Sequence, residues 1–241
     1  MVKGSTIEHF RSNLVSILKS YGVLIGLILI IIIASIVESS FFTANNMLNI
    51  LRQASVIGIV SLGVTYTMML GRLDLSVGST VSLCSVVAVS IMNAYALTPD
   101  SNGTVIIVLL TVSVVGFLIG VVNGSIISAL NGRLGESFII TYGMMIVVGA
   151  LALLYSRGQF IAGTFGNVLY SRIGTGFLPI ISFLLLAIVM HIVLAKSRFG
   201  KQICFMGANI ECARMSGIRV GLLQIIAYGI CGLCAGLAAI I

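Results

Sequence analysis

Long apolar runs separated by short polar stretches make up most of the chain. The first run is "YGVLIGLILIIIIASIV" at residues 21–37, and further runs follow at about 54–70, 75–96, 104–130, 137–155, 177–195 and from 221 onward. About 20 apolar residues carry a helix across a bilayer, whereas the strands of a membrane barrel show a shorter alternating pattern. The pattern therefore predicts about seven transmembrane helices.

Composition supports this reading. The chain is 59% hydrophobic and 8% charged, whereas soluble domains carry about 25% charged residues. There is too little polar sequence to cover a water-soluble domain. We therefore expect an all-α, polytopic transmembrane helical bundle surrounded by membrane lipid.

The positive charge indicates orientation rather than nucleic acid binding. The formal net charge is +7, but the basic residues are scattered among loops and form no dense patch. The segment 196–219 has five Lys or Arg residues against the single acid Glu211, and the amino terminus is also basic. Basic loops mark the cytoplasmic side, and the six runs between these segments allow both to be cytoplasmic.

The stretch "MLGRLDLSVGST" at residues 69–80 interrupts the apolar pattern with Arg72 and Asp74. A charged side chain at mid-bilayer costs about 2.5–3.5 kcal/mol on insertion scales. Gly71 favours a break in the helix, after which Arg72 and Asp74 could pair, or Asp74 or Ser76 could cap the next helix. The break is either a capped connection between two spans or an element that lines a translocation path.

Small and polar residues mark the run at 104–130. Gly116, Gly120 and Gly124 repeat every four residues, which predicts close helix packing. Asn123 lies beside this stripe, either as an interhelical hydrogen-bond donor or as a pore residue.

Catalytic and metal-binding motifs are missing from the sequence. Cys231 and Cys234 form a C-x2-C inside an apolar run, where small packing residues are the simpler interpretation than a metal or redox site. No G-x4-G-K-[ST], H-E-x-x-H or G-x-S-x-G occurs. We expect no cofactor, no metal and no enzymatic activity, so any ATP hydrolysis belongs to a separate subunit.

Three stretches together resemble the permease subunit of ribose-type ABC sugar importers. They are "GRLDLSVGS" at 71–79, "FIITYGMMIVVGALALLYSRGQFI" at 138–161 and "SRFGKQICFMGANIECARMSGI" at 197–218. The resemblance implies a type II-like importer permease in the bacterial inner membrane, with its amino terminus cytoplasmic. Its implied partners are a cytoplasmic ABC ATPase, a periplasmic sugar-binding protein and a second permease subunit in a homo- or heterodimer.

In that family the segment matching 196–219 is a cytoplasmic coupling loop with a short helix that docks on the ATPase. The resemblance places this helix at about 209–216. The implied coupling residues are Gly207 and Gly217 at its edges, with Asn209, Glu211 and Arg214 between them.

The chain departs from the family pattern in several places. Arg72 stands where the family has a second glycine, "GAN" replaces Gly-Gly-Asn at 207–209, the acid is shifted to Glu211, and Cys212 replaces an alanine. The family normally continues for another three or four spans, so we expect 1–241 to be one incomplete permease domain that does not transport alone. The alternatives are a branched-chain amino-acid permease of the same superfamily and an ion-coupled secondary transporter.

Overall fold

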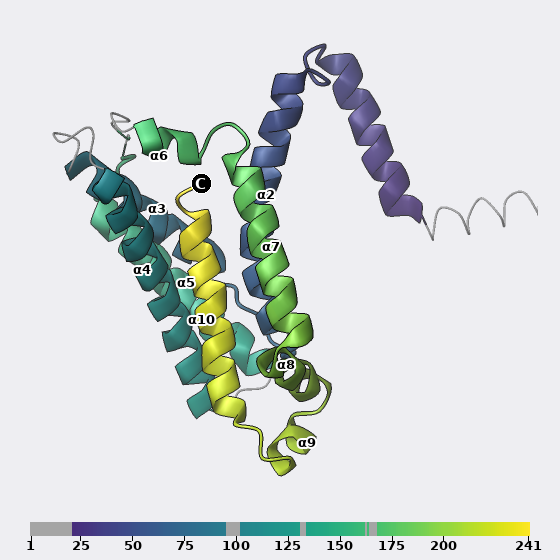
Figure 1. Ribbon diagram of the computed structural model, residues 1–241, viewed down its shortest axis with the longest axis vertical. Helices are drawn as coiled ribbons and strands as arrows, with labels where there is room; N and C mark the ends of the chain where they lie inside the picture. The colour runs from purple at the N-terminus through teal and green to yellow at the C-terminus, as the bar shows by residue number, and fades with distance from the viewer. Residues whose placement is uncertain (1–20, 95–101, 131–133, 162, 164–167) are drawn as a thin grey trace, which may run out of the picture. The chain divides into compact units, whose positions relative to one another are not determined.

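A computed structural model describes residues 21–94, 102–130, 134–161, 163 and 168–241 (Figure 1). Two compact units are present, Met1–Ile50 and Leu51–Ile241, and each is described by itself. Within the described residues, six helices are long and apolar enough to cross a membrane, and a shorter apolar helix covers Tyr21–Val37. The predicted all-helical polytopic bundle is confirmed.

The helices follow the predicted runs closely. Their bounds are α2 Ala44–Met69, α3 Val77–Ala94, α4 Asn102–Ala129, α5 Leu134–Ser156, α6 Val168–Ile173, α7 Leu178–Lys196, α8 Arg198–Ala208, α9 Ile210–Met215 and α10 Val220–Ala238. Helices α6 and α9 are short, with 6 residues each, and α8 is an additional helix that the apolar pattern did not predict.

Helix α2 begins ten residues before the predicted start of its span. The Thr43 hydroxyl accepts a hydrogen bond from the Asn46 amide at 3.4 Å, and the Thr43 carbonyl accepts one from the Met47 amide at 3.0 Å. Threonine is a favoured N-cap residue. The polar stretch "TANNMLNILRQ" therefore extends the helix, because it contains a cap and no helix-breaking residue.

Helix α10 is the central helix of the unit Leu51–Ile241. Of its most apolar 18 residues, 61% are buried, against 11–28% in the other five long helices. It packs closely along α4, and it also contacts α3, α8 and α9. The outward faces of the other helices carry exposed large apolar side chains, as expected of surfaces that contact lipid.

An apolar cluster joins α2, α7, α8 and α10. It includes Ile59, Tyr66, Ile203 and Met206, each no more than 2% exposed. The Tyr66 hydroxyl donates to the carbonyl of Met190 on α7 at 2.7 Å, so the one polar atom of that ring is satisfied. This cluster holds α8 against the ends of the long helices.

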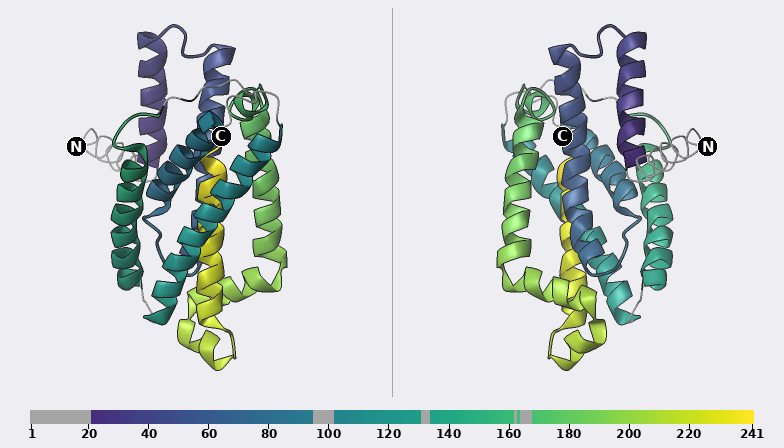
Figure 2. Two further views of the ribbon diagram at one scale, coloured as in Figure 1. Left: turned by 90° about the vertical axis from the view of Figure 1, so that its left-hand side faces the viewer. Right: turned by 90° about the vertical axis from the view of Figure 1, so that its right-hand side faces the viewer.

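Successive long helices run in opposite directions, and the connections therefore lie at two ends (Figure 1). Both views of Figure 2 show α8 and α9 at one end of the bundle and α6 at the other. Arg172 lies in α6, whereas Lys196, Arg214 and Arg219 lie in or beside α7, α9 and α10 at the α8–α9 end.

Candidate functional site

The break between α2 and α3 is an ordered structure that begins with a regular helix end. Gly71 has φ of 70°, a backbone conformation that glycine adopts without strain. The amide of Gly71 donates to the Met68 carbonyl at 2.9 Å, and the amide of Arg72 donates to the Thr67 carbonyl at 3.0 Å. This pair of bonds is the Schellman motif that commonly ends helices.

Asp74 and Ser76 cap the start of α3. The Asp74 Oδ1 atom accepts from the Ser76 amide at 3.0 Å and from the Ser76 hydroxyl at 2.7 Å. The Ser76 carbonyl accepts from the Thr80 amide at 2.9 Å, which starts the helical pattern. Of the two arrangements left open by the sequence, the structure thus has the cap.

The Ser76 hydroxyl also connects α3 to α4. While it donates to Asp74, it accepts a hydrogen bond from Asn123 Nδ2 at 2.7 Å. Asn123 is fully buried and Ser76 is 1% exposed. Asn123 therefore joins the glycine-rich helix to the cap of α3.

Arg72 bonds to α10 and is 3% exposed. With the Gln224 carboxamide oriented so that its oxygen faces the guanidinium, Arg72 Nε and Nη2 donate to that oxygen at 2.9 and 2.6 Å. Gln224 is itself 2% exposed. A charge that would be costly in lipid is thereby held inside protein by a polar partner.

The backbone of the break is held by two further helices. The Leu73 carbonyl accepts from the Tyr228 hydroxyl of α10 at 2.9 Å and, more weakly, from the Thr141 hydroxyl of α5 at 3.5 Å. Asn123 and Tyr228 lie six and eight residues from the ends of their helices, which is about 10 Å at 1.5 Å per residue. The break therefore lies inside the bundle, where irregular backbone is tolerated because protein satisfies it.

Two polar atoms of this cluster have no hydrogen-bond partner. They are Arg72 Nη1 and Asn123 Oδ1, and both are buried. The cluster thus offers one donor and one acceptor that a polar molecule could satisfy. Within the described part of the chain, no group of three or more His, Cys, Asp or Glu side chains is placed to hold a metal ion.

The glycine stripe of α4 faces α10. A Cβ atom at Gly116 would overlap the Gly232 carbonyl, and one at Gly120 would overlap the Tyr228 carbonyl. At Gly124 it would lie 2.7 Å from the Cα of Ile225. Helices that approach this closely need residues without side chains at the contact.

The cysteines of α10 pack against α2. Both Cys231 and Cys234 are buried and free, and a Cβ atom at Gly63 would lie 2.8 Å from the Cβ of Cys234 and 3.0 Å from the Cα of Cys231.

Helix α8 lies against Met69, the last residue of α2 before the break. Ser197 caps α8 by accepting from the Gly200 amide at 3.0 Å. Ile203 and Met206 face the core. Gly207 lies in the last turn of α8, not at the edge of the helix expected at 209–216, and a Cβ there would overlap the Met69 carbonyl.

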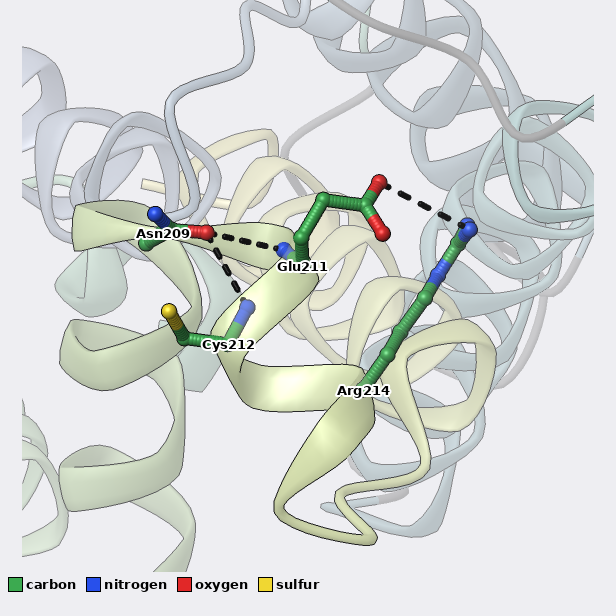
Figure 3. Close-up of polar contacts among 4 residues, drawn as sticks. All are labelled: Asn209, Glu211, Cys212 and Arg214. Carbon is green, nitrogen blue, oxygen red and sulfur yellow. Dashed lines mark hydrogen bonds and ion pairs between the residues drawn. The ribbon is translucent and has the colours of Figure 1, made fainter.

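Helix α9 is a short helix with well-defined caps at both ends, and Figure 3 shows the cap at its start. Asn209 Oδ1 accepts from the amides of Glu211 and Cys212, each at 3.0 Å. At its end, Gly217 has φ of 75°, and its amide donates to the Arg214 carbonyl at 3.0 Å. The predicted helix at 209–216 thus coincides with α9 and its two caps.

The exposed face of α9 carries opposite charges. Arg214 Nη1 and Glu211 Oε1 are 4.0 Å apart, with side chains 41% and 72% exposed (Figure 3). An exposed pair at this distance adds little to stability. The two side chains therefore form an exposed charged face on α9.

The sequence pattern did not indicate that Gln224, Tyr228 and Thr141 bond to the break. Of these three residues, Gln224 could best have been recognised as a partner of the break, because it is the one amide side chain in an otherwise apolar run. The apolar runs did not predict α8 either, although its apolar positions Ile203 and Met206 recur at helical spacing.

Comparison with known proteins places this architecture in a family. Residues 46–241 match the family model described as "Branched-chain amino acid transport system / permease component". The chain is 34% identical over 225 residues to the ribose import permease protein RbsC of Escherichia coli K12, an alignment that covers 90% of this chain and 67% of that protein.

Two further relatives show the same relationship. The ribose import permease protein RbsC of Bacillus subtilis is 30% identical over 239 residues, covering 97% of this chain and 71% of the relative. The galactose/methyl galactoside import permease protein MglC of E. coli K12 is 32% identical over 238 residues, covering 92% and 70%. No solved structure matches. The chain therefore belongs to the permease family of ribose- and galactose-type ABC importers, as the three sequence motifs indicated.

Proposed function

We propose that this chain is the membrane-spanning subunit of an ATP-driven bacterial sugar importer, and that α9 docks on a cytoplasmic ABC ATPase. The observation that carries this proposal is α9 itself. It is capped at both ends, exposes Glu211 and Arg214, and stands on α8, which is anchored in the core. A short helix fixed in this way can transmit force from a soluble partner to the membrane helices.

Charge supports a cytoplasmic position for the α8–α9 end. Lys196, Arg198, Lys201, Arg214 and Arg219 gather there against Glu211 and, at the start of α5, Glu136. Basic residues next to membrane spans favour the cytoplasm. The α6 end would then face the periplasm and receive a sugar-binding protein.

The names of the relatives support a sugar as substrate, since both ribose and galactose permeases match over most of the chain. The family description names branched-chain amino acids, and such a substrate is the second candidate.

Importers of this class work as paired subunits, so we expect a second permease chain. The break at Gly71, Arg72, Asp74 and Ser76, with Asn123 beside it, would line the translocation path.

Labelling of native cysteines tests the orientation. Cys204 and Cys212 are exposed and lie on α8 and α9, whereas Cys84, Cys231 and Cys234 are buried. A membrane-impermeant maleimide should label inside-out vesicles and spare intact spheroplasts. The Cys204→Ser/Cys212→Ser variant, which keeps the three buried cysteines, is the control. Labelling from the periplasmic side alone would refute the orientation.

Charge reversal at α9 tests the docking. In membranes that contain the complete permease, the ATPase and the binding protein, Glu211→Lys should lower sugar uptake and reduce the amount of ATPase that copurifies. Glu211→Gln keeps the size of the side chain and is the matched control. Gly207→Trp should also uncouple transport, but it would displace α8 from Met69 and is therefore less specific. Undiminished uptake and copurification with Glu211→Lys would count against docking at α9.

A further inference from the structure

The helices on either side of α9, which are α8 and α10, both contact residues at the break between α2 and α3. On the side before α9, Gly207 of α8 abuts the carbonyl of Met69, the last residue of α2. On the side after α9, the first turns of α10 carry Gln224, which bonds Arg72. The break between α2 and α3 is therefore contacted from both directions by the elements that hold α9.

Helix α10 bonds to the break through two side chains, Gln224 and Tyr228, on one helical face. Gln224 and Tyr228 are four residues apart, a spacing that places side chains one above the other. Gln224 accepts from the Arg72 side chain, and Tyr228 donates to the Leu73 carbonyl at 2.9 Å. Successive residues of the break are thus tied to successive turns of α10.

The Arg72–Gln224 contact is the stronger of the two points. It involves a charged donor and two hydrogen bonds to one oxygen, and both side chains are at least 97% buried. Hydrogen bonds to charged groups are stronger than those between neutral groups. Removing one partner leaves the other buried and unpaired, whereas replacing both by apolar groups can be nearly neutral.

We propose that Arg72 and Gln224 are a positioning pair that carries movement of the α8–α9 segment to the break between α2 and α3, an inference that rests on the proposed docking of an ATPase. When α9 is displaced, α10 moves with it, because only Ser216–Arg219 separate the two helices. Gln224 then moves the Arg72 guanidinium, and the cap formed by Asp74 follows. The break is rearranged by its bond to α10 without any contact to the ATPase.

The test compares single and double substitutions. Gln224→Met leaves the guanidinium unpaired, whereas the Arg72→Met/Gln224→Met double variant removes both polar groups. Hydrogen exchange of the amides at 70–76 should accelerate about tenfold or more in Gln224→Met, and much less in the double variant. Ser125→Ala, which removes only a bond within α4, should leave this exchange unchanged.

A second measurement separates a positioning role of Arg72 and Gln224 from a contribution to the stability of the protein. Each variant is reconstituted with the ATPase and the binding protein, and the ribose or galactose imported per ATP hydrolysed is measured. The double variant should fold well yet import several-fold less sugar per ATP. A double variant with the wild-type ratio, or one whose exchange matches that of Gln224→Met, would overturn the inference. Absence of ATP-dependent uptake by the complete wild-type permease with both partners would instead reject the proposed function, and the exchange comparison would still decide whether the two residues act as a pair.

Discussion

Substitution of Gly120 by alanine tests the contact between α4 and α10. A methyl group at Gly120 would overlap the Tyr228 carbonyl oxygen, and it would lie 2.7 Å from the Tyr228 carbonyl carbon and 3.0 Å from the Cα of Gly229. Carbon atoms pack at about 3.5–4.0 Å, so the helices must separate by about 1 Å. The obstructing atoms belong to backbone, which cannot rotate away as a side chain would.

Gly143→Ala is the reference for the stability that Gly120→Ala should lose. Gly143 lies inside α5, and a Cβ there would meet nothing within 4 Å. Both substitutions gain about 1 kcal/mol of helix propensity, and this gain cancels in the comparison. The remaining difference is the cost of overpacking, about 1–3 kcal/mol. Gly120→Ala should therefore be less stable than Gly143→Ala by about that amount.

The assay is unfolding of the purified protein in detergent, followed by the loss of helical circular dichroism. Hydrogen exchange of the Ser76 and Val77 amides provides a local readout, because Asn123, which bonds Ser76, lies less than one turn from Gly120. Exchange there should increase in Gly120→Ala and not in Gly143→Ala. Equal stability of the two variants would refute the close contact between α4 and α10.

Three further substitutions probe other hydrogen bonds. Asn209→Ala removes the N-cap of α9, at a cost of about 1 kcal/mol, and should accelerate exchange of the amides at 211–213; unchanged exchange would contradict the cap. Asn123→Ala deletes the donor to Ser76 and should lower the free energy of unfolding by about 1 kcal/mol, whereas Ser125→Ala should not; equal effects would argue against an interhelical role. Tyr66→Phe removes the bond to α7 and should lower the unfolding temperature more than Tyr142→Phe, whose ring is 48% exposed; the reverse order would be inconsistent with the bond.

The sequence was sufficient to predict the membrane helices and the family. Hydropathy is a local property that adds along the chain, so each long helix could be read from its own run with errors of a few residues. The exception was the start of α2, where Thr43 caps a polar extension of the helix. The stretches at 71–79, 138–161 and 197–218 predicted the family because their residues resemble the family pattern in matching order along the chain.

Only the tertiary structure shows which side chains and helix faces contact one another. The sequence left open whether Arg72 pairs with Asp74, and only the packing of α10 against the break places Gln224 at the guanidinium. It predicted a small-residue stripe at Gly116 and Gly120, but the partner helix follows only from the fold. The contacts of α10 with α4 and with the break join residues more than 100 positions apart, and no local pattern encodes which faces come together. Hydropathy thus determined which segments are helices in the membrane, while side-chain packing and buried hydrogen bonds determined how the break between α2 and α3 is held.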